Sequence, residues 1–143
     1  MPVKLMLIKI IILGGFWIMN EIIVKEDIKI EDMIYEVRGK KVMIDSDVAL
    51  LFGYETKQLN RQVQRNINRF PENYCFQITD AEYELLRCHF GTLKNGRGEH
   101  RKYLPYVFTE YGITMLAGLL KSDTAVAMSI RIVDVFIAMK KYL

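Results

Sequence analysis

Two sets of side chains recur every four residues between Thr56 and Phe70. The basic set is Lys57, Arg61 and Arg65, and the apolar set is Leu59, Val63 and Ile67. The two sets are offset by two positions, which corresponds to about 200° of rotation on an α-helix. A helix over this stretch therefore turns its basic row away from the core that holds its apolar row.

The polar residues of this stretch have the chemistry of DNA recognition. Arg, Asn and Gln pair bidentately with guanine and adenine edges in the major groove, and Lys and Arg neutralise phosphates. No carboxylate lies between Thr56 and Phe70, so the basic row does not form a salt-bridge ladder along its own helix. The candidate DNA-contacting residues are Lys57, Gln58, Arg61, Gln62, Arg65, Asn66 and Arg69. The alternative interpretation is an ordinary solvated helix face.

A second basic segment precedes Tyr103 and carries a single acid, Glu99. Its cations are Lys94, Arg97, Arg101 and Lys102. Gly96 and Gly98 allow a close approach to a phosphate backbone, so we expect this loop to hold DNA beside the helix. The alternative is a flexible, solvated loop. The segment lacks the Gly-Lys-Ser/Thr ending of a Walker loop, which argues against nucleotide binding.

The other reactive side chains do not indicate catalysis or metal binding. Cys75 and Cys88 are the only cysteines, and with the 2 histidines they form no pair at metal-binding spacing. Glu110 suits the first turn of a helix, where the dipole favours a carboxylate. We expect a non-enzymatic cytoplasmic protein with reduced cysteines and without metal, cofactor or small-molecule substrate.

The first 18 residues differ from the rest of the chain. They are apolar, and Lys4 and Lys9 supply two of the three net positive charges. Three interpretations are open: a strand or helix of the fold, a membrane signal, or upstream gene sequence with translation starting at Met19. We favour the last, because Gly14-Gly15 can be encoded as a ribosome-binding site; other codons there would exclude it. We expect no membrane span, because the apolar run is shorter than about 20 residues.

The elements that position the basic row can be predicted from turn and cap residues. A β-hairpin is expected around Arg38-Gly39-Lys40. A short helix capped by Asp45 or Ser46 then ends at Gly53, and a second helix runs from a Thr56 cap to about Arg69. This order is typical of a helix-turn-helix-like pair, which places the basic row on the second helix.

The remaining elements complete an α+β domain over residues 20–143. We expect a strand at "NYCFQIT", a helix opened by the capping box from Thr79 to Glu82, and a strand whose Pro105 indicates an edge or a bulge. Thr109 is expected to cap the next helix, and Ser122 or Asp123 a long final one. No linker divides the chain after the leader, so we predict a small single domain.

The final helix carries two apolar stripes. The first is Ala125, Met128, Ile132, Phe136 and Met139, and the second is Val126, Ile130, Val133 and Ile137. A helix packed on one core needs only one stripe. The second stripe is therefore either buried in a central, deeply buried helix or forms a homodimer interface.

Three segments together resemble one protein family. They are "MIYEVRGKKVMIDSDVALLFGYETKQLNRQVQRNINRFPENYCFQIT", "GEHRKYLPYVFTEYG" and "SIRIVDVFIAMKK". The family is the KilA-N-type N-terminal domain of phages, prophages and large DNA viruses, in the branch named for the N-terminal domain of phage open reading frame six. The resemblance covers most of the chain after the leader. One departure is Tyr111, which stands at a position where members of this family commonly have Gln.

This resemblance implies an α+β DNA-binding domain of phage or prophage regulatory proteins, often antirepressor-like. It places the basic helix 57–69 on duplex DNA, with help from the loop 94–102. The alternative function is a protein-interaction module, an antirepressor that neutralises another regulator without binding DNA itself.

Overall fold

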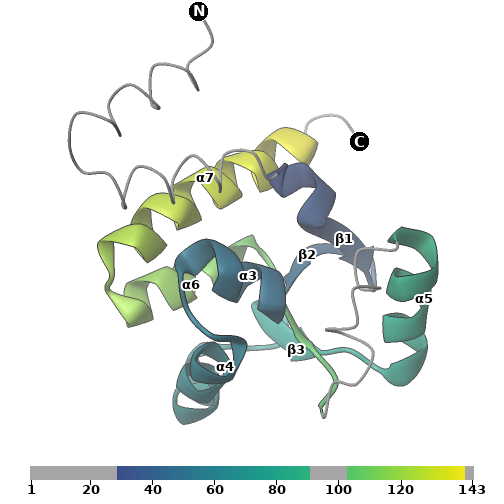
Figure 1. Cartoon of the computed structure of the whole chain (residues 1–143), viewed down its shortest axis with the longest axis horizontal. Coiled ribbons are helices and arrows are strands. Elements are labelled where there is room, and N and C mark those ends of the chain that lie inside the picture. Colours follow the sequence, from purple (N-terminus) through teal and green to yellow (C-terminus); the bar gives the residue numbers. More distant parts are fainter. Residues whose placement is uncertain (1–28, 91–102, 141–143) are drawn as a thin grey trace, which may run out of the picture. The chain divides into compact units, whose positions relative to one another are not determined.

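The computed structural model describes residues 29–90 and 103–140, and the chain from Glu31 onward forms one compact unit (Figure 1). Its elements are η1 (Ile30–Met33), β1 (Ile34–Val37), β2 (Lys40–Ile44), α3 (Asp45–Phe52), α4 (Thr56–Arg65), η2 (Ile67–Arg69), β3 (Cys75–Gln77), α5 (Asp80–Phe90), β4 (Tyr106–Phe108), α6 (Glu110–Leu120) and α7 (Asp123–Lys140). The predicted α+β class, with its hairpin, helix pair, short strands and long last helix, is confirmed.

The hairpin forms where the sequence predicts it. Val37 pairs with Lys40, so the loop consists of Arg38 and Gly39 alone. Both have positive φ angles, 55° and 73°, which is the geometry of a type I′ turn. This turn type matches the twist of its two strands, and Gly39 adopts it without steric cost.

The four strands form one antiparallel sheet in the order β1-β2-β4-β3. β4 is therefore a central strand, and the prediction of an edge or a bulge at Pro105 is wrong. Pro105 lies just before β4, where its missing N–H breaks no ladder bond. Its carbonyl oxygen accepts a hydrogen bond from the Ile78 N–H at 3.1 Å.

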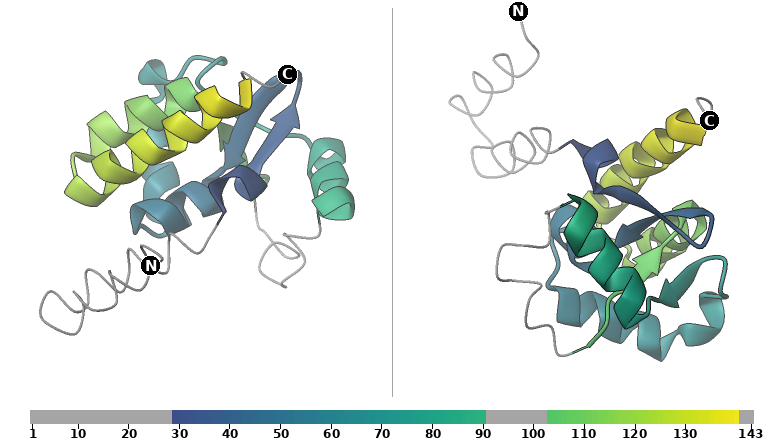
Figure 2. Two further views of the ribbon diagram at one scale, coloured as in Figure 1. Left: turned by 90° about the horizontal axis from the view of Figure 1, so that it is seen from above. Right: turned by 90° about the vertical axis from the view of Figure 1, so that its right-hand side faces the viewer.

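Helices cover both faces of this sheet. The apolar cluster on the α5 side consists of Tyr35, Val37, Val42, Ile44, Phe76, Ile78, Tyr83, Leu86 and Val107. Met43 and Phe108 are paired in register, and strand alternation turns them to the opposite face, where α3 and α6 contact β2 and β4. Figure 2 shows α5 on one side of the sheet and the neighbouring α6 and α7 on the other.

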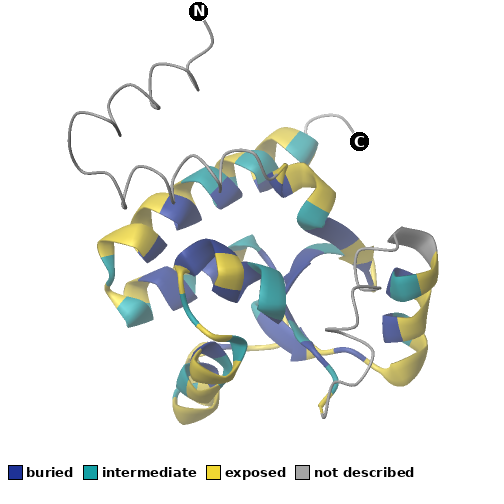
Figure 3. Cartoon of the chain, in the orientation of Figure 1, coloured by how far each residue is buried: buried dark blue, intermediate teal, exposed yellow. Residues whose placement is uncertain are grey.

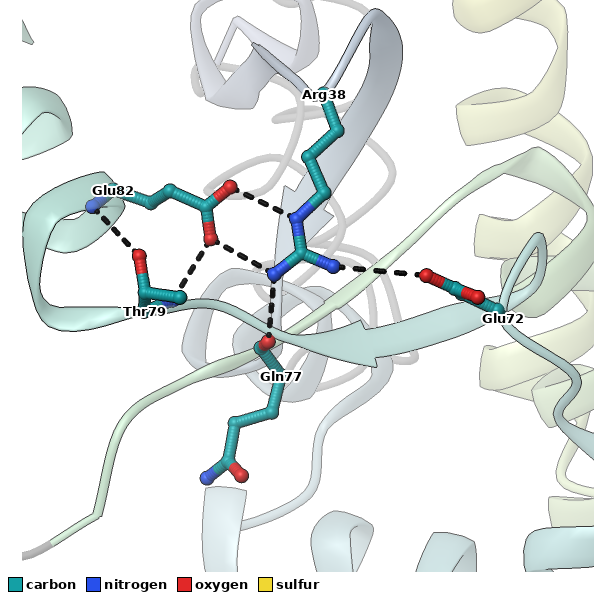
Figure 4. Close-up of polar contacts among 5 residues, drawn as sticks. All are labelled: Arg38, Glu72, Gln77, Thr79 and Glu82. Carbon is teal, nitrogen blue, oxygen red and sulfur yellow. Dashed lines mark hydrogen bonds and ion pairs between the residues drawn. The ribbon is translucent and has the colours of Figure 1, made fainter.

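Arg38, in the turn between β1 and β2, forms an ion pair with Glu82 of α5 (Figure 4). Its Nε and Nη2 donate to the Glu82 carboxylate at 2.9 and 3.0 Å, and its guanidinium lies 4.5 Å from the Phe76 ring centroid. Nη2 also donates to the Gln77 carbonyl at 3.4 Å. Hydrogen bonding to Arg38 is the main cause that lowers the pKa of Glu82 from 4.5 to about 2.

This ion pair predicts a pH-dependent stability. Because the folded pKa of Glu82 is depressed, its contribution is complete above pH 4.5 and is lost as the pH falls toward about 2. Glu82→Gln keeps an acceptor for the Thr79 N–H but removes the charge. We expect the variant to unfold at a lower temperature than the wild type at pH 7 and at nearly the same temperature at pH 2. Glu31→Gln, at an exposed carboxylate, is the control, and an equal pH-dependent loss there would contradict the assignment.

The helices are capped at their N-termini, although the capping residue is not always the predicted one. The Thr79–Glu82 capping box, the Thr109 cap and the Ser122 cap are confirmed. The predicted caps of α3 and α4 are wrong. Ile44, rather than Asp45 or Ser46, occupies the cap position of α3, and Glu55, rather than Thr56, that of α4. The Asp45 carboxylate is instead buried in long-range contacts.

The long helix α7 buries only one of its two apolar stripes. Ala125, Ile132 and Phe136 are fully buried, whereas Ile130 and Ile137 of the second stripe are exposed. The interpretation of α7 as a central helix buried on several sides is therefore wrong. Within residues 29–90 and 103–140, no helix is long and apolar enough to cross a membrane.

Candidate nucleic-acid interface

α3 and α4 form the predicted helix pair, joined by a tight turn at Gly53. Gly53 has a φ of 78°, in the left-handed region that glycine adopts most easily. Its N–H and the N–H of Tyr54 donate to the carbonyls of Leu50 and Ala49 at 3.3 and 2.9 Å. These bonds end α3 and direct the chain into α4.

α4 separates an apolar face from a basic face, as the spacing predicts. Leu59 and Val63 are completely buried, whereas Lys57, Arg61 and Arg65 are exposed. In Figure 3 the outward side of α4 is accordingly coloured as exposed. In the part of the chain that the structure describes, none of these three cations forms an ion pair.

The apolar row of α4 ends earlier than predicted. Ile67 is 55% exposed, whereas Phe70 is buried and packs edge-on against Phe108. The helix stops at Arg65, and the tighter η2 turn that follows shifts the phase of the side chains. The prediction that the helix continues to about Arg69 and buries Ile67 is therefore wrong.

Two of the amides predicted to read bases are engaged within the chain. The Gln58 Oε1 accepts from the Glu55 N–H at 3.2 Å, and the Asn66 Nδ2 donates to the Gln62 carbonyl at 2.9 Å. These bonds satisfy backbone groups at the two ends of α4. The Gln62 side chain is half-buried and hydrogen-bonds to no described residue, so of the three amides it is the one free to reach a base edge.

α4 is fixed to the sheet by a polar bridge that sequence spacing did not reveal. The fully buried Asp45 carboxylate accepts from the Asn60 Nδ2 at 2.9 Å and from the Tyr106 N–H at 3.1 Å. Gln64 donates a further hydrogen bond to the Tyr106 hydroxyl. One residue of β4 thus contacts α3 and α4, which sets the direction of the basic face. The sequence did not predict this role of Asp45, because an Asp at the start of a helix is ordinarily interpreted as a cap.

Asp45→Ala is expected to destabilise the fold by about 3 kcal/mol, because the Asn60 amide and the Tyr106 N–H lose a buried acceptor. Chemical denaturation measures this loss. Asp134→Ala, which removes an exposed carboxylate from α7, should change stability by less than about 0.5 kcal/mol. Equal effects of the two substitutions would contradict the role of Asp45.

An open hollow of about 390 Å³ adjoins Arg69, the last of the candidate DNA-contacting cations between Thr56 and Phe70. Its lining residues are Arg69, Tyr74, Tyr111, Thr114, Met115, Gly118 and Leu119. The rings of Tyr74 and Tyr111 stack with centroids 5.4 Å apart and planes at 25°. Tyr111, which stands where the resembled family commonly has Gln, is 52% exposed and helps to build this aromatic wall beside Arg69.

The predicted loop cations Lys94, Arg97, Arg101 and Lys102 lie outside the described residues. Cys75 and Cys88 are free thiols, and burial, followed by the charge of Asp45, raises the pKa of Cys75 to about 12. Cys75 is therefore a poor nucleophile. Where the structure describes the chain, no group of three His, Cys, Asp or Glu side chains could hold a metal ion.

The fold and this surface define an α+β domain that presents the basic second helix of a helix pair. The model of the ORF6N domain family matches residues 32–119. The matched stretch begins in η1 and ends one residue before the end of α6. The chain belongs to the ORF6N domain family. Searches of curated proteins and of solved structures found no match. α7 lies beyond the matched residues.

Proposed function

We propose that this chain is a duplex-DNA-binding domain of KilA-N type from a phage or prophage regulatory protein, with α4 on the DNA. The observation that carries the proposal is the row of Lys57, Arg61 and Arg65, exposed and without an ion pair among the described residues, opposite the buried Leu59 and Val63. Three cations that point in one direction and form no ion pair with a described residue make a surface complementary to phosphates.

The geometry suits insertion of α4 into the major groove. This groove is about 12 Å wide and admits one α-helix. Arg61 and Arg65 lie one turn apart, so their guanidinium groups can reach neighbouring base pairs or the phosphates beside them. Lys57, at the N-terminal end of α4, is placed for a phosphate, and Gln62 for a base edge.

The supporting contacts reduce the cost of binding. The Asp45 bridge and the Gln58 and Asn66 caps hold α4 in place before DNA arrives. A helix that is already oriented loses little conformational entropy on docking. Arg69 extends the basic surface toward the Tyr74–Tyr111 wall, and the loop 94–102 supplies further phosphate contacts in this proposal.

The domain acts in the cytoplasm as a non-catalytic regulator in this proposal. The alternative, an antirepressor that neutralises another regulator, uses protein contacts instead of α4. Titrating the full chain with random duplex DNA distinguishes the two. The DNA-binding function predicts binding that weakens with added salt, and then enrichment of a preferred sequence by selection. Failure to bind DNA at about 50 mM salt would contradict it. A plasmid assay with added divalent metal should show no cleavage.

A further inference from the structure

The exposed stripe of α7 has the spacing of a helix–helix seam. Val126, Ile130 and Ile137 are 44%, 59% and 45% exposed, and Val133 between them is half-buried. Successive members are separated by four, three and four residues. Continuing this alternation by three residues at each end reaches Asp123 and Lys140, the two ends of α7. Such spacing places apolar side chains in one narrow line, as in the a and d positions of a coiled coil.

This seam is distinct from the face that holds α7 on its own domain. The buried side chains Ala125, Met128, Ile132 and Phe136 lie about 120° around the helix from the seam. The seam therefore contributes little to the intramolecular core.

We propose that the seam binds the α7 seam of a second copy of this chain in antiparallel orientation. The spacing of its four residues is symmetric about the midpoint between Arg131 and Ile132. In that register Val126 of each copy faces Ile137 of the other, and Ile130 faces Val133. A two-fold axis at this midpoint makes both halves of the interface equivalent, as symmetric dimers require.

The charges at the two ends of α7 favour the antiparallel orientation. It places Asp123 of one copy beside Lys140 of the other, at both ends of the interface. A parallel arrangement would instead place Asp123 beside Asp123 and Lys140 beside Lys140, which is unfavourable. Lys140 also forms an ion pair with Glu110 of its own chain. This pair holds the Lys140 side chain near the end of α7, and the ammonium group keeps further N–H donors for Asp123 of the second copy.

The full chain should therefore be a dimer at micromolar concentration in light scattering or sedimentation equilibrium. Ile130→Asp inserts a charge at the seam twice per dimer, and the dissociation constant should rise at least about 100-fold. Leu85→Asp is the matched control, because Leu85 is 60% exposed on α5. It should leave the dimer intact. Circular dichroism verifies that both variants remain folded. A monomeric wild type, or equal effects of the two substitutions, would overturn the proposal.

Disulfide cross-linking tests the orientation. In a Cys88→Ser background, chains carrying Val126→Cys should cross-link with chains carrying Ile137→Cys. Chains carrying Val126→Cys alone should not link to each other, because the antiparallel register separates these positions by about 16 Å along the axis. Self-linking of Val126→Cys chains would overturn the antiparallel register. None of these measurements needs DNA, so the dimer and the DNA-binding function can fail independently.

Discussion

Replacing Arg61 and Arg65 together by alanine is expected to weaken duplex-DNA binding about a hundredfold at low salt. Each Arg contact to a base edge or its phosphate contributes about 1–3 kcal/mol, and about 3 kcal/mol for both corresponds to about two powers of ten. Both side chains are exposed on α4 and hold no other element in place. The variant should therefore unfold at nearly the wild-type temperature. Fluorescence anisotropy with a labelled duplex measures the affinity.

A charge-matched variant separates the role of α4 from net charge. Arg87→Ala with Lys121→Ala also removes two positive charges, one on α5 and one at the end of α6. Its affinity should fall by less than about threefold, because charges outside α4 act on the bound DNA only through a screened field. Equal losses in both double variants would show that DNA responds to total charge, and α4 would no longer be the contact surface.

Gly112→Ala is expected to have the largest effect on stability, at least about 3 kcal/mol. A Cβ atom at this position of α6 would lie 2.1 Å from the Tyr74 carbonyl oxygen, a backbone atom that cannot rotate away. That oxygen also accepts from the Thr109 N–H at 3.1 Å, so moving it disrupts the cap of α6. The melting temperature should fall by about 10 °C.

Gly118 of the same helix provides the control. A Cβ atom there meets nothing within 4 Å. Gly118→Ala should raise stability by about 0.5–1 kcal/mol, because alanine loses less conformational entropy in a helix. Opposite signs for the same chemical change in one helix would demonstrate that α6 approaches the Tyr74 backbone closely. A stabilising effect at Gly112 would contradict the packing.

Local chemistry explains which parts of the fold were predictable. Arg38-Gly39, Thr109 and the Thr79–Glu82 box each act within a few residues, so their elements follow directly from the sequence. The basic face of α4 was predictable for the same reason, because two periodic rows on one helix fix each other's direction.

Long-range contacts explain what was missed. The Asp45–Asn60–Tyr106 bridge joins residues 15 and 61 positions apart, and no pattern within a helix reveals it. The central position of β4 depends on pairing with β2 and β3 from earlier in the chain. The end of α4 at Arg65 depends on η2 and on the packing of Phe70 against Phe108. Which of the two apolar stripes of α7 is buried likewise depends on tertiary packing.

The salt dependence of duplex binding is the most direct test that α4 is the DNA-binding face. If Lys57, Arg61, Arg65 and Arg69 each neutralise one phosphate, these four residues contribute about −3.6 to the slope of log K against log salt for the wild type. The affinity then falls at least about a hundredfold between about 50 and 200 mM salt. If Arg61 and Arg65 both contact phosphates, the Arg61→Ala, Arg65→Ala variant should give a slope that is shallower by about 1.8. A wild-type affinity that does not change with salt would contradict DNA binding through α4.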